Sequence, residues 1–156
     1  MSARRCGICS ASLDADNIAL FCSMVCAEQA SADSVVLDLD HIVEMNTDYL
    51  RVIHTTVQSQ LTVMHITREA AGIHAERHPN TTQFLRIHSG RGVVLIEGES
   101  RALEPGTCVM VSPNAEHEVV QIGIEPLKLS SIYSPPVHAY NRVEHVRPAE
   151  EDTDKA

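Results

Sequence analysis

The sequence predicts an all-β domain, a sandwich or a closed barrel, with a small cysteine-rich segment in front of it. Short runs rich in Val, Ile and Leu recur from residue 50 onward, and clusters of Gly, Pro and Asn separate them. Aromatic residues make up only 3% of the chain and Trp is absent, so branched aliphatic side chains, which favour strands, must fill the core. A hydrophobic content of 44% is enough for one folded domain in 156 residues.

Residues 1–32 are predicted to form a zinc-binding unit. Four of the five cysteines lie in this segment, as one pair at Cys6 and Cys9 and a second pair at Cys22 and Cys26. In a reducing compartment paired cysteines are more commonly metal ligands than disulfides, and four thiolates suit a structural Zn²⁺ in a closed tetrahedral site. A segment this short cannot bury a core, so the metal would supply its folding energy. Reduced cysteines without a metal, or disulfides, are the alternatives.

The rest of the chain divides into a linker at residues 33–41, a β domain at 42–146 and an acidic disordered tail at 147–156. Within the linker, Val35–Asp40 is expected to be a short strand or a lead-in to the domain. Cys108 begins an apolar run and is expected to be an inert core thiol. The predicted strands are Leu50–Thr55, Gln60–Ile66, Gly72–His78, Gln83–His88, Gly92–Ile96, Cys108–Val111, His117–Gln121 and Leu127–Ser131.

Four polar side chains of the β domain are predicted to form one metal site. Glu76 and His78 are two residues apart, so an extended strand points both to the same face. Gln83 opens the apolar run after one Pro-Asn turn, and His117 follows a second Pro-Asn turn. Two imidazole nitrogens with carboxylate and amide oxygens suit a divalent first-row metal. His74, on the same strand face, is a further candidate ligand or outer partner, with a structural role as its alternative. Hydrogen-bonded core histidines are the alternative for His78 and His117.

The alternation of strand side chains also predicts what surrounds that metal. If the metal lies inside a barrel, the wall around it is apolar with a few convergent polar groups, which is the usual form of a small-molecule site. Ser131 and Tyr133 then become candidates for contact with a substrate, and Glu76 becomes a candidate base as well as a ligand. The predicted inward rows are His74, Glu76 and His78; Gln83, Leu85 and Ile87; His117, Val119 and Gln121; and Leu127, Leu129, Ser131 and Tyr133.

The spacing of these residues resembles the two motifs of the cupins, a family of small β-barrels. The matching segments are Ala70-x5-Glu76-x-His78-x4-Gln83-x6-Gly90 and Gly106-x5-Ser112-x-Asn114-x2-His117-x3-Gln121. Glu76 stands where the family has its first His and Gln83 where it has Glu, and each still offers an oxygen. Asn114 stands at a turn glycine, and Asn tolerates the left-handed conformation that such a turn requires.

The resemblance implies a cupin jelly-roll barrel over residues 42–146, with metal ligands at Glu76, His78, Gln83 and His117. The closing part of the domain is similar to a cupin subgroup described as mannose-6-phosphate isomerase-like, and cupins often pair as homodimers. In the first segment, Phe-Cys-Ser-x-x-Cys at 21–26 resembles an FCS or treble-clef zinc finger, which implies Zn²⁺ on the four cysteines and a surface for a protein partner.

Composition and missing motifs exclude several classes of function. A net charge of −9 opposes the broad basic surface that nucleic acids or anionic membranes require. The chain has no apolar run of membrane-spanning length and no signal-peptide pattern, so an intracellular, reducing, cytoplasmic location is expected. Nucleophile-elbow, Walker and dinucleotide motifs are missing, and a single carboxylate in the site opposes a glycosidase mechanism.

Two hypotheses remain. The first is a small cupin metalloenzyme, isomerase-like or oxygenase-like, that acts on a sugar phosphate, a keto acid or a similar polar metabolite with Fe, Mn, Zn or Ni in the barrel. The second is a non-catalytic module for metal-dependent ligand binding or assembly, in which the zinc finger is the docking element. Fold alone does not separate them.

Overall fold

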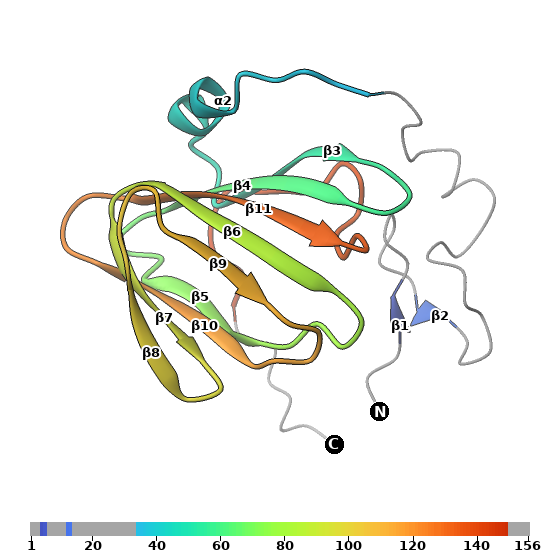
Figure 1. Ribbon diagram of the computed structural model, residues 1–156. Coiled ribbons are helices and arrows are strands. Elements are labelled where there is room, and N and C mark those ends of the chain that lie inside the picture. Colours follow the sequence, from blue (N-terminus) through green and yellow to red (C-terminus); the bar gives the residue numbers. More distant parts are fainter. Residues whose placement is uncertain (1–3, 6–11, 14–33, 150–156) are drawn as a thin grey trace.

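The computed structural model describes residues 4–5, 12–13 and 34–149 (Figure 1). The predicted four-cysteine site and the chain beyond residue 149 lie outside the described residues. In the first part of the chain the structure describes one short antiparallel pair, β1 (Arg4–Arg5) with β2 (Ser12–Leu13). All further statements about the fold concern residues 34–149.

Two antiparallel sheets face each other and form a jelly roll (Figure 1). One sheet has six strands in the order β12-β3-β4-β11-β6-β9, and the other has four strands in the order β5-β10-β7-β8. The strands are β3 (Leu50–Thr55), β4 (Gln60–Ile66), β5 (Gly72–Glu76), β6 (Thr82–Ser89), β7 (Arg91–Ile96), β8 (Glu99–Leu103), β9 (Cys108–Val111), β10 (His117–Ile122), β11 (Leu127–Ser134) and β12 (Val143–Glu144). The all-β prediction is confirmed, and each predicted strand is present with small changes at its ends.

The core lies between the two sheets and is made of alternate strand residues. Three of the four predicted inward rows are buried throughout, with at most 8% of any residue exposed, whereas His74, Glu76 and His78 are only partly buried. The apolar members pack into one cluster with Met64 and Ile66 of β4 and with Val94 of β7. Because side chains alternate along a strand, this burial fixes which face of β6, β10 and β11 looks into the barrel.

Two strands and a helix were not predicted. Of the two alternatives for Val35–Asp40 the strand is wrong, because residues 34–38 have no regular structure and lead into helix α2 (Leu39–Met45). The Asp38 side chain caps this helix by accepting a hydrogen bond from the backbone N–H of His41. Strand β8 gave no signal since its first four residues are exposed, and β12 has only two residues. No described helix is long and apolar enough to cross a membrane.

The prediction that Cys108 is a core thiol is also wrong. Its side chain is exposed, because β9 is an edge strand and Cys108 lies opposite Arg86 on the outer face of the six-stranded sheet. Val109 and Val111 of the same strand point inward. The run Cys-Val-Met-Val therefore alternates between the two faces, and its uniform hydrophobicity concealed this.

A chain of polar contacts holds helix α2 against the outer face of the six-stranded sheet. Asp40 Oδ1 lies 3.0 Å from His88 Nδ1, and His88 Nε2 lies 2.8 Å from Ser130 Oγ. Serine hydrolases use the same three residue types, but Ser130 is only 4% exposed, in the middle of β11. The chain of contacts is therefore structural. Together with the buried side chain of Val43, which is 2% exposed, it holds α2 against the sheet.

A glycine lets β5 approach β10 closely. A Cβ atom at Gly72 would lie 1.9 Å from the carbonyl oxygen of Val119, and the φ angle of +152° is one that other residues rarely adopt. The carbonyl oxygen of Gly72 accepts a hydrogen bond of 3.0 Å from the Tyr49 hydroxyl. This contact fixes the strand that ends at Glu76.

Candidate metal centre

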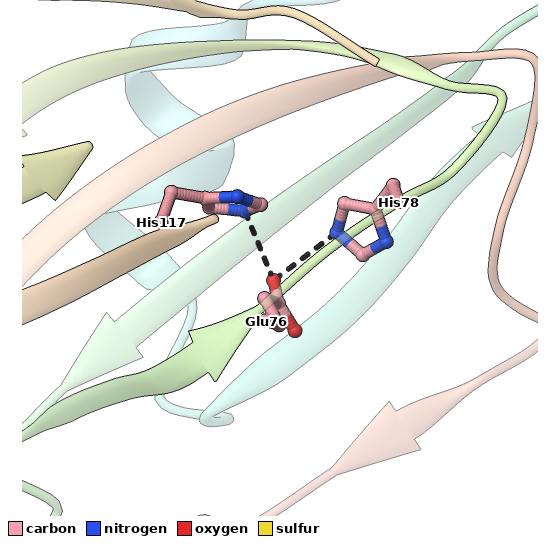
Figure 2. A group of neighbouring side chains, drawn as sticks. All are labelled: Glu76, His78 and His117. Atoms are coloured by element: carbon pink, nitrogen blue, oxygen red, sulfur yellow. Dashed lines mark hydrogen bonds and ion pairs between the residues drawn. The ribbon is translucent and has the colours of Figure 1, made fainter. Parts of the chain in front are cut away.

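Three of the four predicted ligands meet at one end of the barrel (Figure 2). Glu76 ends β5, His78 lies in the turn after it, and His117 begins β10. Glu76 Oε1 lies 3.2 Å from His78 Nε2 and 3.4 Å from His117 Nε2. The three candidate ligand atoms all lie within 4.8 Å of one another.

A bulge in β5 brings Glu76 opposite His117. His117 pairs with Glu76 and Val119 pairs with Ile73, so β5 has one residue more than β10 between these pairs. The bulge shifts the alternation of side chains, so that Ile73 rather than His74 is buried in the core. The prediction that His74 shares an inward face with Glu76 is therefore wrong, and a role for His74 as a ligand or outer partner stays a prediction.

His74 instead contacts the end of the described chain. Arg147 Nε lies 2.8 Å from His74 Nε2, and Arg147 Nη1 also donates to the carbonyl oxygen of Ala70. The group of candidate ligands in the described residues does not include His74.

His78 is positioned by a hydrogen bond between two turns. Its carbonyl oxygen accepts the backbone N–H of Asn114 at 2.8 Å. Asn114 has a φ of +65°, as predicted from its place at a turn glycine. On the outside, Arg77 donates to the Asn114 carbonyl at 2.9 Å and pairs with Glu116 at 3.2 Å. The turn that carries His78 is thus joined to the turn that leads into His117.

The orientation of the His117 ring is set by its other nitrogen. Nδ1 lies 3.0 Å from the carbonyl oxygen of Ala115, so Nδ1 carries a proton and donates it. His117 Nε2 then faces Glu76 Oε1 at 3.4 Å, and the described residues offer it no other polar partner. Metal-binding histidines commonly show this arrangement, in which one nitrogen is held by a carbonyl and the other is available to the metal.

The charges of the group stabilise one another. Burial by itself raises the pKa of Glu76, but hydrogen bonds and charge from His117 and His78 outweigh it and lower the pKa to about 2. Burial by itself lowers the pKa of His117, but the contact with Glu76 and the hydrogen bond to Ala115 outweigh it and raise this pKa. Glu76 is therefore ionised at neutral pH, and since its side chain is 37% exposed, the group is open to solvent.

Gln83 and Tyr133 lie on neighbouring inward rows next to His78. The Gln83 amide nitrogen donates to the Tyr133 hydroxyl at 3.1 Å and to Ser131 Oγ at 3.3 Å. Its oxygen, Oε1, is buried and has no hydrogen-bond partner among the described residues. The Tyr133 ring stands edge-on to the His78 ring, with centroids 5.6 Å apart, and burial raises the pKa of Tyr133, so it keeps its proton. A ligand role for Gln83 stays a prediction.

The donor set fits a divalent first-row metal ion. With bonds of about 2.1 Å, two ligand atoms of a tetrahedral or octahedral ion lie roughly 3.0–3.4 Å apart. The two distances from Glu76 Oε1, 3.2 and 3.4 Å, are of this size. Among the described residues, Gln83 Oε1 is a buried polar atom without a hydrogen-bond partner, and a metal would satisfy such an atom.

Sequence reasoning missed His138, which lies in the irregular segment after β11. Its ring packs edge-on against Tyr133 with centroids 5.0 Å apart. Burial lowers the pKa of His138 to about 3, so the ring is neutral. No spacing signal could have found it, since it belongs to no strand. The inward faces of β4, β6 and β11 also carry buried polar side chains among the apolar ones: Gln60, Thr62, Gln83 and Ser131.

Comparison with known proteins supports the fold. Residues 62–133 match the family model of the cupin domain. The chain is 32% identical over 120 residues to the uncharacterized protein YrkC of Bacillus subtilis (strain 168), a match that covers 72% of this chain and 63% of that protein. It is 30% identical over 107 residues to the uncharacterized protein L612 of Acanthamoeba polyphaga mimivirus, which covers 66% of each. This chain thus spans just under two thirds of the length of these relatives.

Solved structures agree with this result. The crystal structure of BH2720 from Bacillus halodurans has a TM-score of 0.70 and 28% identity, and it covers 74% of this chain and 92% of that chain. KdgF from Halomonas sp. has a TM-score of 0.51 and 22% identity, covers 55% of this chain and 76% of that chain, and supports the fold alone. The barrel therefore has the cupin jelly-roll fold.

Proposed function

Starting from a cupin jelly-roll barrel, we propose that this protein binds one divalent first-row metal ion through Glu76, His78 and His117, with Gln83 as the fourth ligand. The observation that carries the proposal is the convergence of one carboxylate oxygen and two imidazole nitrogens within 4.8 Å of one another. The hydrogen bond from His117 Nδ1 to Ala115 supports it, because it leaves Nε2 available to the ion. A set of nitrogen and oxygen ligands suits Fe, Mn, Zn or Ni.

The partly exposed position of the group supports a role in binding a polar small molecule. Glu76 and His78 have side chains that are 37% and 16% exposed, so a ligand can reach the metal position from solvent. A bound metal would supply Lewis-acid polarisation of a ligand oxygen. The side chains of the barrel would orient the bound molecule. Gln83 and Ser131 are buried, and the Gln83 amide donates hydrogen bonds to Ser131 and to Tyr133.

The protonation states favour particular roles for the two predicted catalytic residues. A carboxylate with a pKa of about 2 is a weak proton acceptor at neutral pH, which supports Glu76 as a ligand rather than as a base. Tyr133 keeps its proton and would act as a hydrogen-bond donor toward a bound oxygen. On these grounds we propose a small metalloenzyme, isomerase-like or oxygenase-like, acting on a polar metabolite.

A second candidate function is a non-catalytic module for metal-dependent ligand binding or assembly. It is favoured by the same protonation states, because neither Glu76 nor Tyr133 is poised to exchange a proton near neutral pH. In this case the cysteine-rich segment would be the docking element. We also propose that Cys6, Cys9, Cys22 and Cys26 hold a structural Zn²⁺; homodimer formation and a cytoplasmic location stay predictions.

A metal and metabolite screen tests these proposals. Apo protein is loaded in turn with Fe²⁺, Mn²⁺, Ni²⁺ or Zn²⁺, its melting temperature is measured, and each loaded form is assayed against a panel of sugars, sugar phosphates and keto acids. At least one barrel metal should raise the melting temperature by several degrees. Turnover with any metal supports the enzyme. Ligand-induced stabilisation without turnover supports the binding module, and no metal effect contradicts both.

The zinc proposal has its own test. A Cys6→Ser, Cys9→Ser double variant should lose about one tightly held zinc per chain while the barrel metal stays, because an all-thiolate site and a His/Glu site are independent. An unchanged zinc content would contradict the four-cysteine site.

A further inference from the structure

A row of apolar side chains crosses the outer face of the six-stranded sheet. Met110 of β9 lies opposite Phe84 of β6. On the next two strands, Ile132 of β11 lies opposite Phe84, and Leu61 of β4 lies opposite Ile132. The residues on either side of each of these four along its strand point into the barrel, so the four side chains point outward. These four residues are called the outer apolar row.

The outer apolar row is open to solvent over much of its length. Met110 is 65% exposed and Ile132 is 41% exposed, while Phe84 and Leu61 are partly buried between their neighbours. The row crosses four adjacent strands, which corresponds to about 14 Å. A contiguous apolar surface on the outside of a sheet indicates an interaction site, whereas single exposed apolar residues do not.

Helix α2 covers another part of the same face and brings the preceding chain close to the row. Asp40 Oδ1, in the first turn of α2, lies 3.4 Å from Arg86 Nη1 and 3.0 Å from His88 Nδ1 of β6. Arg86 and Phe84 are two residues apart on one strand face, a separation of about 7 Å. Figure 1 shows α2, and residues 34–38 before it, on the outer side of the six-stranded sheet.

The reach of the chain places residue 34 near the row. Residues 34–38 can span at most about 17 Å, and α2 begins directly after them, over β6. This connection is itself apolar: Val35, Val36 and Leu37 are 47%, 101% and 40% exposed. The chain before residue 34 is therefore attached within reach of every member of the outer apolar row.

The sequence of that preceding chain suits an apolar surface. Residues 14–33 lie outside the part of the chain that the structure describes. They include no Lys or Arg, and they are too few to bury a core of their own. Their larger apolar members fall within eight positions: Ile18, Leu20, Phe21, Met24 and Val25. A bound zinc ion would hold the cysteines but would not remove these side chains from water.

Attachment to the same chain favours this segment over a second copy of the protein. A segment joined to its surface by a short connection meets it at an effective concentration on the order of millimolar. A second copy at micromolar concentration is about a thousandfold more dilute, so equal contacts would be filled from within the chain.

We propose that residues 14–33 dock on the outer apolar row of their own chain, with their apolar side chains against Phe84, Met110 and Ile132. The inference goes beyond the proposed function, because the row belongs to the six-stranded sheet and two of the candidate metal ligands, Glu76 and His117, belong to the other sheet. The cysteine-rich segment and the barrel are then one folded unit joined by an apolar interface.

Limited proteolysis of the full chain tests the docking. Glu28 is the one glutamate before residue 44, so a protease that cuts after glutamate reports on residues 14–33 at a single bond. Cleavage after Glu44 of α2, followed by mass spectrometry in the same digest, reports on opening of the barrel itself. Proteolysis follows the population of the open state, so docking should slow cleavage after Glu28.

Three variants assign the protection to the outer apolar row. Met110→Lys places an ammonium group under the segment, on the edge strand β9, and should speed cleavage after Glu28 tenfold or more. Met110→Leu keeps an apolar side chain and should cut at the parent rate. Ile122→Lys is the matched control, since Ile122 is 49% exposed on β10 of the other sheet, and it should also cut at the parent rate.

Two results would overturn the docking. The first is a Met110→Lys protein in which cleavage after Glu28 stays at the parent rate, or rises no more than cleavage after Glu44. The second comes from the molar mass in solution at micromolar concentration, which should be the same for the parent and all three variants. A parent dimer that Met110→Lys alone separates into monomers would assign the row to a second copy instead.

Discussion

Replacing Gly72 by alanine tests how the β5–β10 contact positions the metal site. The new Cβ would lie 1.9 Å from the Val119 carbonyl oxygen and 2.9 Å from its carbonyl carbon. A carbon–oxygen contact needs about 3.3 Å, so the strands must separate by roughly 1.4 Å. Overpacking costs about 1–3 kcal/mol and the unfavourable backbone angle about as much again, so the loss in stability should be about 4 kcal/mol.

A second glycine of the chain provides a matched control. Gly98 also has a positive φ, +83°, but an added Cβ meets no atom within 4 Å. Gly98→Ala should therefore show the backbone cost alone, about 1–2 kcal/mol. At about 4 °C per kcal/mol for a domain of this size, the melting temperature should fall by roughly 15 °C for Gly72→Ala and by 4–8 °C for Gly98→Ala.

Thermal and urea unfolding of both variants, with and without the barrel metal, measure these effects. Gly72→Ala should also weaken metal binding, because moving β5 away from β10 separates Glu76 from His117. Gly98→Ala should leave metal affinity unchanged. Equal destabilisation of the two variants, or full metal affinity in Gly72→Ala, would refute the close approach and its role in the site.

Three further predictions concern the charges of the site. The lowered pKa of Glu76 stabilises the apo protein above pH 4.5, and this stability is lost as the pH falls toward 2. The raised pKa of His117 stabilises the apo protein below pH 6.5, and this stability is lost as the pH rises through the pKa of His117 in the folded protein. The contribution of the Glu76–His117 pair to stability should therefore be greatest between about pH 4.5 and 6.5. Calorimetry at several pH values should show this maximum in the parent and not in Glu76→Gln. Identical pH profiles of stability for the two proteins would contradict the pairing. Metal affinity should change in the opposite direction at low pH, weakening below the folded pKa of His117 because the ion must displace a proton. Gln83→Glu places an anionic oxygen at a position that is 1% exposed, so it should destabilise the apo protein by about 1–3 kcal/mol and tighten divalent metal binding; a variant with unchanged metal affinity would show that Gln83 is no ligand.

The sequence was most informative where burial imposes a simple alternation. The inward rows of β6, β10 and β11 follow a period of two, so their burial could be predicted residue by residue. Spacing also placed Glu76, His78 and His117 in one site, and the turn position of Asn114 predicted its left-handed conformation. These features depend on local geometry, which a sequence pattern records directly.

The failures come from features that depend on the assembled fold. The bulge in β5 shifts the alternation by one residue, so His74 faces Arg147 instead of the metal group. The exposure of Cys108 follows from the place of β9 at a sheet edge, which local hydrophobicity does not encode. His138 joins the site from an irregular segment through Gln60, far away in the sequence.

Metal analysis of the parent beside a His78→Ala, His117→Ala double variant tests the central claim most directly. Both proteins are purified without chelator, their divalent metal content is measured, and the apo forms are titrated with the metal found. His41→Ala serves as the control for loss of a surface histidine. We predict about one barrel metal per chain in the parent and the control, and its loss from the double variant, because the ion would keep only oxygen ligands. A double variant that holds the same metal with the same affinity would contradict the site.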